Sequence, residues 1–469
     1  MAIPKEILKL KPKNTRVKAT SDPNIFNVIK RTCITKNGKS YPVELGVIGK
    51  IINNEYIELK KKTYEIDIKN YGGFALTEKL NSDLFMDLLK YYPLDDAKKI
   101  YTIASLRVLN EDIKNEEILT EYKTSFISEK YPNCGLSANT ISEFLDSIGK
   151  QTSIMEEFMN YRLNKFAKNP IVIDGMLKSN TSKTNIFSEY SRKSRIKGTM
   201  DINLLYAYDL VTEEPVASGV YPGNMLDYTA FRDFLDRFSF KNGFLIMDKG
   251  FSDKESKAIM SAQGVKYLIP IKLNQLKNKL NYKEGFNYCF KFFDDMIRAK
   301  KVQVNDTFYY CYKSTKHKAM QDTRYMERVN RLNVYSEDDY LAKEDTFGLI
   351  IFESNADLPL KEIYYAYKKR WEIEELFRTF KNILDQSEEN VHGTYRLIAS
   401  EFINFISAIM LSRIRNYLIK LKILEKYSFP NVIRYLSKIL KKRAPRNNDT
   451  WVKTKTLKYI EELAKNLGI

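Results

Sequence analysis

The pattern of hydrophobic and polar positions changes character along the chain. From about residue 26 to 68, β-branched residues lie on both sides of the Asn-Gly dipeptide at 37–38, which is a strong signal for a β-hairpin. From about residue 80 to 161, apolar residues recur at helical spacing instead. Within that stretch, Ser137 can cap a helix that ends near Gly149. The first third of the chain therefore predicts a hairpin followed by helices.

After residue 165 the pattern predicts strands and helices in alternation. The predicted elements are a strand at 169–175, a hairpin around the turn Val211–Glu214, a helix Asp227–Phe238, a strand Gly243–Asp248, a helix Asp253–Gln263 and a strand at 265–271. This order is typical of an α/β core with a mixed sheet flanked by helices. Asp174 and Asp248 each end an apolar strand, where functional groups of such sheets collect.

The remaining pattern divides the chain further. Residues 272–344 are polar, aromatic and strand-like without helical periodicity, and a core strand follows at 346–354. A long helix is predicted at Tyr364–Asp385 and another at 398–421. We therefore expect five regions: 1–160 as an N-terminal β/α region, 165–271 and 345–420 as two parts of one core, 272–344 as a β-rich insertion, and 421–469 as a basic helical region.

The net charge of the chain indicates which class of binding partner to expect. The chain has 77 Lys+Arg against 59 Asp+Glu, a formal net charge of +18, which favours a nucleic acid because neutralised phosphates release counterions. A Lys-rich proteome, or a basic RNA-binding, ribosome-associated or membrane-surface protein, would account for the same excess.

Cysteine and histidine usage limits the chemistry. Four cysteines form no CxxC pair and only two histidines are present, so structural zinc and a disulfide framework are not expected. Hydrolysis or group transfer must then rest on carboxylates, lysine or cysteine. The N-terminus lacks a signal-peptide core, and the longest apolar run, Phe402–Leu411, is too short to span a bilayer. We expect a soluble, cytoplasmic protein with no membrane partner.

The predicted helix Tyr364–Asp385 carries a coherent polar stripe. On a helical wheel, four polar residues share an arc of roughly 60° beside the apolar stripe: Tyr367, Arg370, Glu374 and Lys381. An ordinary surface helix with i,i+4 ion pairs would give a similar stripe. Together with Asp174 and Asp248, however, Glu374 supplies the third carboxylate of a site for hard divalent cations. Two such ions are an established solution for in-line displacement at a phosphodiester.

The segment YKKRWEIEELFRTFK matches the Y-x2-R-x3-E-x6-K signature of bacterial insertion-sequence transposases in the insertion-sequence-four superfamily. IDG and MDKGF resemble the family's first and second aspartate motifs, and YPGNMLDYTAF is similar to its Gly-Asn-x-x-Asp stretch. The resemblance covers roughly residues 165–415.

The resemblance implies an RNase H-like catalytic core interrupted by a β-rich insertion. It implies that the metal-binding catalytic triad consists of Asp174, Asp248 and Glu374, with two Mg²⁺ ions and Mn²⁺ as a substitute. It also implies that the DNA phosphates of the transposon end are held by Tyr367, Arg370 and Lys381. One departure concerns a tryptophan that some relatives use in the insertion to stack a flipped base. Here the only tryptophans are Trp371 and Trp451, so the sequence leaves a DNA hairpin intermediate undecided.

The expected activity is cut-and-paste DNA transposition, in which the strands are cleaved and transferred at the terminal inverted repeats of an insertion sequence. The partners are then double-stranded DNA, as transposon ends and target, and a second copy in a homodimeric synaptic complex. The hairpin and the helix Ser137–Gly149, as part of a helix-turn-helix, are both candidates for recognising the repeats. Residues 421–469 are the candidate dimer contact. The alternative is a catalytically silent, transposase-derived DNA-binding regulator.

Overall fold

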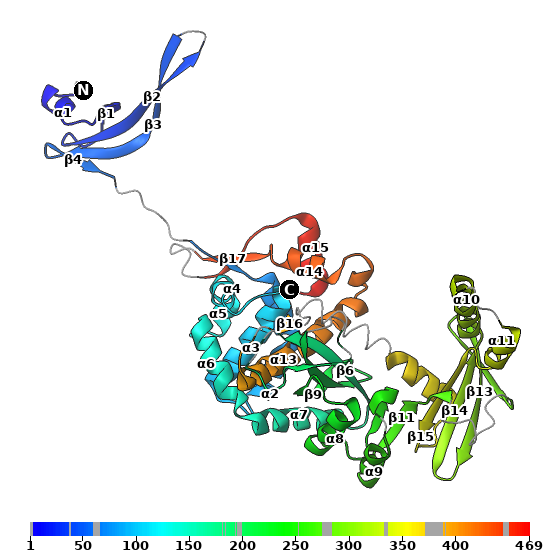
Figure 1. Ribbon diagram of the computed structural model, residues 1–469. Coiled ribbons are helices and arrows are strands. Elements are labelled where there is room, and N and C mark those ends of the chain that lie inside the picture. The colour runs from blue at the N-terminus through cyan, green and yellow to red at the C-terminus, as the bar shows by residue number, and fades with distance from the viewer. Residues whose placement is uncertain are drawn as a thin grey trace. The chain divides into compact units, whose positions relative to one another are not determined.

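The computed structural model describes residues 3–36, 39–59, 66–180, 182, 184–192, 194, 199–251, 253–273, 284–332, 336–370, 388–389, 391–443 and 450–469. The chain divides into two compact units (Figure 1). Unit 1 comprises Met1–Asp67 with Arg443–Thr450, and unit 2 comprises Ile68–Lys442 with Trp451–Ile469.

Unit 1 is a small antiparallel sheet with one short helix. Its elements are α1 (Lys5–Lys9), β1 (Thr15–Ala19), β2 (Ile25–Lys36), β3 (Lys39–Ile52) and β4 (Glu55–Glu58), with the strands in the order β1-β2-β3-β4. Strands β2 and β3 pair from Ile25 opposite Ile52 to Lys36 opposite Lys39, which confirms the predicted hairpin. Among the described residues, the core cluster of unit 1 contains Ile7, Val17, Val28 and Ile51.

Unit 2 begins with helices gathered around a buried helix from the C-terminal half. These are α2 (Gly72–Leu88), α3 (Leu94–Leu109), α4 (Ile118–Thr124), α5 (Ile127–Lys130), α6 (Ala138–Gly149) and α7 (Thr152–Lys165), and the central helix is α13 (Thr394–Lys420). Helices α2, α3 and α6 pack against α13. By length and composition α13 could cross a membrane, but 89% of its most apolar window is buried inside the protein. Its hydrophobicity therefore matches its place in the core.

The mixed sheet of unit 2 follows the predicted order of elements. Its first part contains β6 (Pro170–Asn180), β7 (Glu189–Tyr190), β8 (Met200–Asp209), β9 (Pro215–Pro222), α8 (Asp227–Arg237), β10 (Phe244–Met247), the 3-10 turn η1 (Lys249–Phe251), α9 (Lys254–Ala262) and β11 (Lys266–Pro270). Strands β6, β10 and β11 are parallel, whereas β8 and β9 are antiparallel to their neighbours. The protein is thus a mixed α/β protein with a mixed sheet, as predicted.

One predicted boundary is wrong. Asp174 does not end its strand, because β6 continues to Asn180 through antiparallel pairing with β8. The parallel partner β10 stops earlier, at Met247 opposite Ile173. At Asp174, β6 is no longer paired with β10 but is still paired with β8. The Asp174 side chain is half-buried, and the residue does not lie in a turn.

The segment 272–344 is only partly β-structure. It contains β12 (Tyr288–Phe292), β13 (Asp295–Val304) and β14 (Thr307–Ser314), followed by α10 (Thr315–Leu332) and α11 (Glu337–Glu344), two helices that the sequence pattern did not predict. No residue of α10 is fully buried, so α10 lies on the surface of the protein. Strand β14 pairs with β15 (Leu349–Ser354), so these strands extend the sheet of the core.

The remaining elements include a three-stranded sheet in the order β18-β17-β5. They are β5 (Asp67–Asn70), β16 (Glu388–Glu389), η3 (Ile423–Glu425), α14 (Phe429–Leu436), β17 (Leu440–Arg443), β18 (Val452–Lys453) and α15 (Lys458–Leu467). Residues 360–370 are also helical and form the described part of the helix predicted at Tyr364–Asp385.

Candidate active site

Asp174 and Asp248 lie at matching positions on two neighbouring parallel strands. Met247 pairs with Ile173; Asp174 is the next residue of β6, and Asp248 is the first residue after the end of β10. Neighbouring strands are separated by about 4.8 Å, so the two backbones bring these carboxylates close together. Both side chains are half-buried.

The register extends this geometry across the sheet. Val172 pairs with Ile246, Ile246 pairs with Leu268, and Leu268 pairs with Ser354 on β15. Paired residues share a face of the sheet, and residues two apart on one strand return to it. Asp174 and Asp248 therefore share a face, and Phe352, two residues before Ser354, lies on it as well.

The helix at 360–370 covers that same face. The Tyr367 ring packs against Phe352 with the ring centroids 4.2 Å apart. Tyr364 packs against Tyr312, the β14 residue that pairs with Ile350, with the centroids 5.0 Å apart. The described part of the signature helix is thus anchored on the face that carries the two aspartates.

Tyr367 and Arg370 lie on the buried side of this helix. Their exposed fractions are 8% and 5%, although the helical wheel predicted a polar stripe at the edge of the apolar one. The Arg370 guanidinium donates a hydrogen bond of 3.5 Å to the Tyr367 hydroxyl and lies 5.1 Å from the ring centroid. Lys368 is half-buried, and burial lowers the pKa of its ammonium group while Asp295 acts in the opposite direction. The first turns of the helix therefore carry cations into partly buried surroundings.

Glu374 and Lys381 lie outside the described residues. Within the described ranges, no group of three His, Cys, Asp or Glu side chains is placed to hold a metal ion. The structure brings together two of the three predicted carboxylates, and it places two of the three predicted phosphate-binding residues over the same face.

Around Asp174, the backbone and two tyrosines define the surroundings. The Gly175 amide donates to Asp174 Oδ1 at 2.9 Å. Tyr206 stands opposite Asp174 on β8. Burial, and then the neighbouring Tyr206 and Asp174, raises the pKa of the Tyr208 hydroxyl, which stays protonated. The residues present fit a divalent cation, since hard cations prefer carboxylate oxygens and no described thiolate or imidazole competes here.

Sequence reasoning missed a buried ion pair on the same face. Lys178, four residues after Asp174 on β6, donates to Glu401 Oε1 of α13 at 2.8 Å, and each side chain is only 3% exposed. The Asn404 side chain also donates to Glu401 Oε1, at 3.2 Å. A lysine in an apolar strand and a glutamate in an apolar helix were the available signals. Separated by 223 positions, they could not be paired from sequence.

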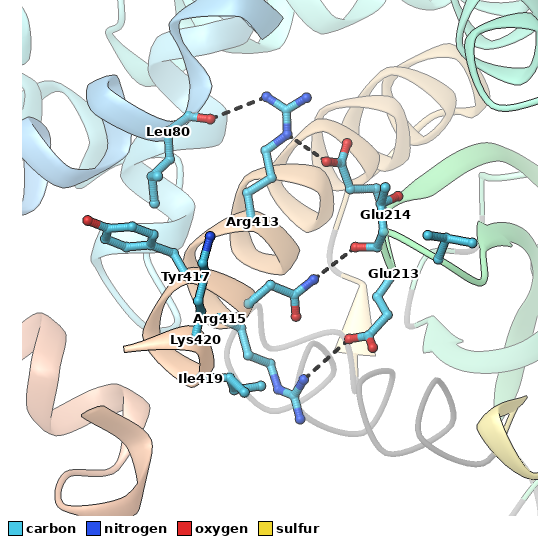
Figure 2. Close-up of a pocket in the computed structure, with 11 residues that line it drawn as sticks. Leu80, Glu213, Glu214, Arg413, Arg415, Tyr417, Ile419 and Lys420 are labelled. Atoms are coloured by element: carbon cyan, nitrogen blue, oxygen red, sulfur yellow. Dashed lines mark hydrogen bonds and ion pairs between the residues drawn. The ribbon is translucent and has the colours of Figure 1, made fainter. Parts of the chain in front are cut away.

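A pocket of about 730 Å³ lies away from the aspartates, between the C-terminal part of α13 and the β8–β9 turn (Figure 2). Its charged side chains neutralise one another: Arg413 contacts Glu214 at 2.9 Å and Asp83 at 2.7 Å, and Arg415 contacts Glu213 at 3.6 Å. None of the predicted site residues lines it. We interpret these contacts as fastening α13 to the sheet.

The family model described as Transposase DDE domain matches residues 166–404, which is more than half of the chain. The chain belongs to this family and is thus a transposase of the DDE class. Both aspartates and the signature segment lie inside the matched region.

Two solved structures are weakly similar to the chain. One is a piggyBac transposase synaptic complex with hairpin DNA, with 11% identity, coverage of 85% of each chain and a TM-score of 0.39. The other is a Mos1 transposase paired-end complex with the left transposon end, with 10% identity, coverage of 38% of this chain and 58% of that chain, and a TM-score of 0.16. Likeness at these TM-scores is too weak to transfer detail. A search of curated proteins found no match.

Proposed function

We propose that this transposase cleaves DNA at the terminal inverted repeats of an insertion sequence and joins the released ends to a target, by cut-and-paste transposition. One observation carries the proposal: the two aspartates directly follow the paired residues Ile173 and Met247 of adjacent parallel strands, on the face that the signature helix covers. We further propose that the core is RNase H-like and that residues 272–344 are an insertion within it. Membership of the insertion-sequence-four superfamily rests on the Tyr-Arg-Glu-Lys spacing in the sequence.

The proposed metal ligands are Asp174, Asp248 and Glu374. Two Mg²⁺ ions, or Mn²⁺ in their place, would activate the attacking oxygen and stabilise the leaving oxygen of an in-line displacement. The Gly175 amide donates a hydrogen bond to Asp174 Oδ1 and so helps to orient this carboxylate. Tyr367, Arg370 and Lys381 are proposed to hold the phosphates flanking the scissile bond. Arg370 is suited to this because a guanidinium binds phosphate through two parallel hydrogen bonds.

The proposal includes the setting of the reaction. We expect the enzyme to act in the cytoplasm, without a membrane partner, as a homodimer that holds two transposon ends, and residues 421–469 are the proposed dimer contact. The alternative is a DNA-binding regulator that has lost catalysis. The two differ in cleavage and not in binding.

The first prediction concerns Asp174→Asn. It should abolish Mn²⁺-dependent cleavage of a duplex carrying the element's end, because an amide cannot supply a second anionic oxygen to a cation. The affinity for the same duplex should stay within about twofold of wild type, since phosphate contacts rather than this carboxylate supply binding. Gel assays of cleaved product and of bound duplex measure the two quantities separately.

Asp236→Asn, on the exposed side of α8, is the matched control and should cleave like wild type. Cleavage by Asp174→Asn at the wild-type rate would remove Asp174 from the site. A wild-type chain that binds the end but never cleaves in Mg²⁺ or Mn²⁺ would favour the silent regulator.

A further inference from the structure

The outer part of the β2–β3 hairpin stands clear of the core of unit 1. Strand β1 pairs with β2 only as far as Lys30, and β4 pairs with β3 only from Gly49 onward. Between these limits the hairpin is a two-stranded ribbon, which we call the β-ribbon, with described residues 31–35 and 39–47. All of these residues are exposed except Val43, which is half-buried. Six residue pairs extend it by about 20 Å.

One face of the β-ribbon is apolar and exposed. Ile34 pairs with Tyr41, and their exposed fractions are 46% and 51%. They continue the face of β2 on which Val28 is buried in the core. Leu45 adds a side chain that is 59% exposed. Large apolar side chains that the described residues of unit 1 leave exposed indicate a contact surface.

The edges of the β-ribbon are poorly suited to pairing with another strand. Pro42 removes one backbone N–H from β3. The register of β2 and β3 shifts at two places, between Val28 and Ile29 and between Lys30 and Arg31, and such bulges increase the local twist. Natural sheets use both devices to prevent edge-to-edge association. A strand of a second copy is therefore a poor partner, and the faces of the ribbon are the better contact surface.

The charge of unit 1 indicates a polyanionic partner. Residues 1–67 and 443–450 together contain 16 Lys+Arg against 8 Asp+Glu, so about a sixth of the chain carries +8 of the total +18. Four exposed basic residues lie on the β-ribbon or immediately beside it: Lys30, Arg31, Lys39 and Lys50. Cations beside apolar and hydroxyl side chains fit a groove of duplex DNA, where phosphates line the walls and base edges the floor.

We propose that the β-ribbon enters the major groove of duplex DNA at the transposon end, a role that rests on the proposed function. The major groove of B-form DNA is about 12 Å wide and admits a two-stranded ribbon. Arg31 and Lys39 contact the phosphates, whereas Tyr41 reaches the base edges. This assigns end recognition to unit 1 and distinguishes it from the chemistry in unit 2.

The helix α6, the other candidate for recognising DNA, packs its apolar face against the core of unit 2. Its apolar positions Ile141, Phe144, Leu145 and Ile148 are buried. Gly149 packs so closely against α13 that an added Cβ would lie 1.9 Å from the Tyr395 carbonyl oxygen. The apolar face of α6 is therefore part of the core. Of the two candidates for DNA recognition, the β-ribbon is the one whose apolar side chains are exposed.

The test measures binding of the full chain to a mixed-sequence duplex as a function of KCl concentration. Each phosphate contact contributes about 0.9 to the slope of log affinity against log salt. Lys39→Ala and Arg31→Ala should each reduce the slope by about 0.9. Lys241→Ala, at an exposed residue between α8 and β10, removes the same charge elsewhere and should leave the slope unchanged.

A second experiment tests whether the β-ribbon recognises DNA sequence. It uses a duplex that the full chain selects from a pool of DNA duplexes with a randomised central segment. Tyr41→Ser should weaken binding to that duplex about tenfold, as expected for one lost base contact, and leave binding to mixed-sequence duplex unchanged. Circular dichroism of each variant checks that the sheet is intact. Duplex RNA should compete poorly, because the deep, narrow major groove of A-form RNA excludes the ribbon.

The exposed Cys33 on the β-ribbon allows a direct measurement. An iron chelate on Cys33 in a Cys289→Ser chain should cut the selected duplex at one position, whereas a chelate on Cys289 of β12 in a Cys33→Ser chain should not cut there. Unchanged salt slopes in both cation variants, or the same cuts from Cys289, would overturn the proposal. A change of the chain's mass in solution with Tyr41→Ser, without a change in DNA binding, would instead make the β-ribbon a contact between copies.

These outcomes are distinct from failure of the proposed function. If the chain cleaves transposon ends with wild-type dependence on Asp174 while the β-ribbon variants bind normally, only the inference about the β-ribbon fails. If the wild-type chain binds no duplex at all, both fail.

Discussion

At the residue scale, the two aspartates depend on neighbours that carry no chemistry themselves. Asp174 lies on β6 between a strand that ends beside it and one that continues past it. Four residues further on, Lys178 ties the same strand to α13 through Glu401. The strand that carries the proposed metal ligand is thereby fastened from the face on which the reaction is proposed to occur.

Lys178→Met should destabilise the protein by about 3–5 kcal/mol, because it leaves the Glu401 carboxylate buried without its cation. The midpoint of urea unfolding measures the change. Lys178→Met combined with Glu401→Gln should recover much of the loss, since the glutamine oxygen can still accept from Asn404.

Lys168→Met, at an exposed lysine just before β6, is the control and should leave the midpoint unchanged within error. A Lys178→Met chain that unfolds at the wild-type midpoint would mean that the ion pair does not hold β6 to α13.

Residue spacing predicted the candidate ligands but not their surroundings. Asp174 and Asp248 follow apolar runs of similar length, which predicted a strand end at each of them. The prediction is wrong for Asp174, because β6 continues to Asn180, but both residues follow the matched pair Ile173 and Met247 on neighbouring strands. The burial of Tyr367 and Arg370 could not be inferred, because Phe352 and the strand beneath it come from a segment that the helical wheel does not contain. The roles of Glu374 and Lys381 remain predictions.

At the element scale, apolar periodicity predicted the elements that pack and missed those that do not. The strands of the core and the helices α8, α9 and α13 lie within a few residues of their predicted bounds. Helix α10 has no fully buried residue and a largely polar sequence, and it was not distinguished from the strand-like segment around it. Strand β6 extends past Asp174 because its backbone N–H and C=O groups are hydrogen-bonded to β8. The local sequence pattern of β6 cannot predict this pairing.

The close contact between α6 and α13 predicts that one added methyl group at Gly149 will destabilise the protein. Gly149→Ala should destabilise the protein by about 1–3 kcal/mol or more, because the new Cβ has no space beside the Tyr395 carbonyl oxygen. The melting temperature measures this.

Ser147→Ala, at an exposed residue of the same helix, should change the melting temperature little. Equal melting temperatures for Gly149→Ala and wild type would show that α6 does not pack closely on α13. Helix α6 would then again be a candidate for DNA recognition.

At the scale of the whole molecule, unit 1 carries far more net positive charge for its size than unit 2, which contains the two aspartates. Unit 1 carries +8 on a small core of few apolar residues, whereas unit 2 contains the sheet with the aspartates. The composition of the full sequence predicted a nucleic-acid partner but not where on the chain it binds. That division emerges only once the compact units are known.

The central claim is that Asp174 and Asp248 hold the divalent cations of a DNA-cleaving transposase. Replacing Asp248 with cysteine tests it most directly, because a thiolate is a poor ligand for Mg²⁺ and a better one for softer ions such as Mn²⁺. Wild type and the control Asp236→Cys should cleave transposon-end duplex in either ion. Asp248→Cys should lose cleavage in Mg²⁺ by about 100-fold or more and regain a large part of it in Mn²⁺, in line with the loss expected when a metal-site residue is altered. Cleavage by Asp248→Cys in Mg²⁺ at the wild-type rate would contradict the account.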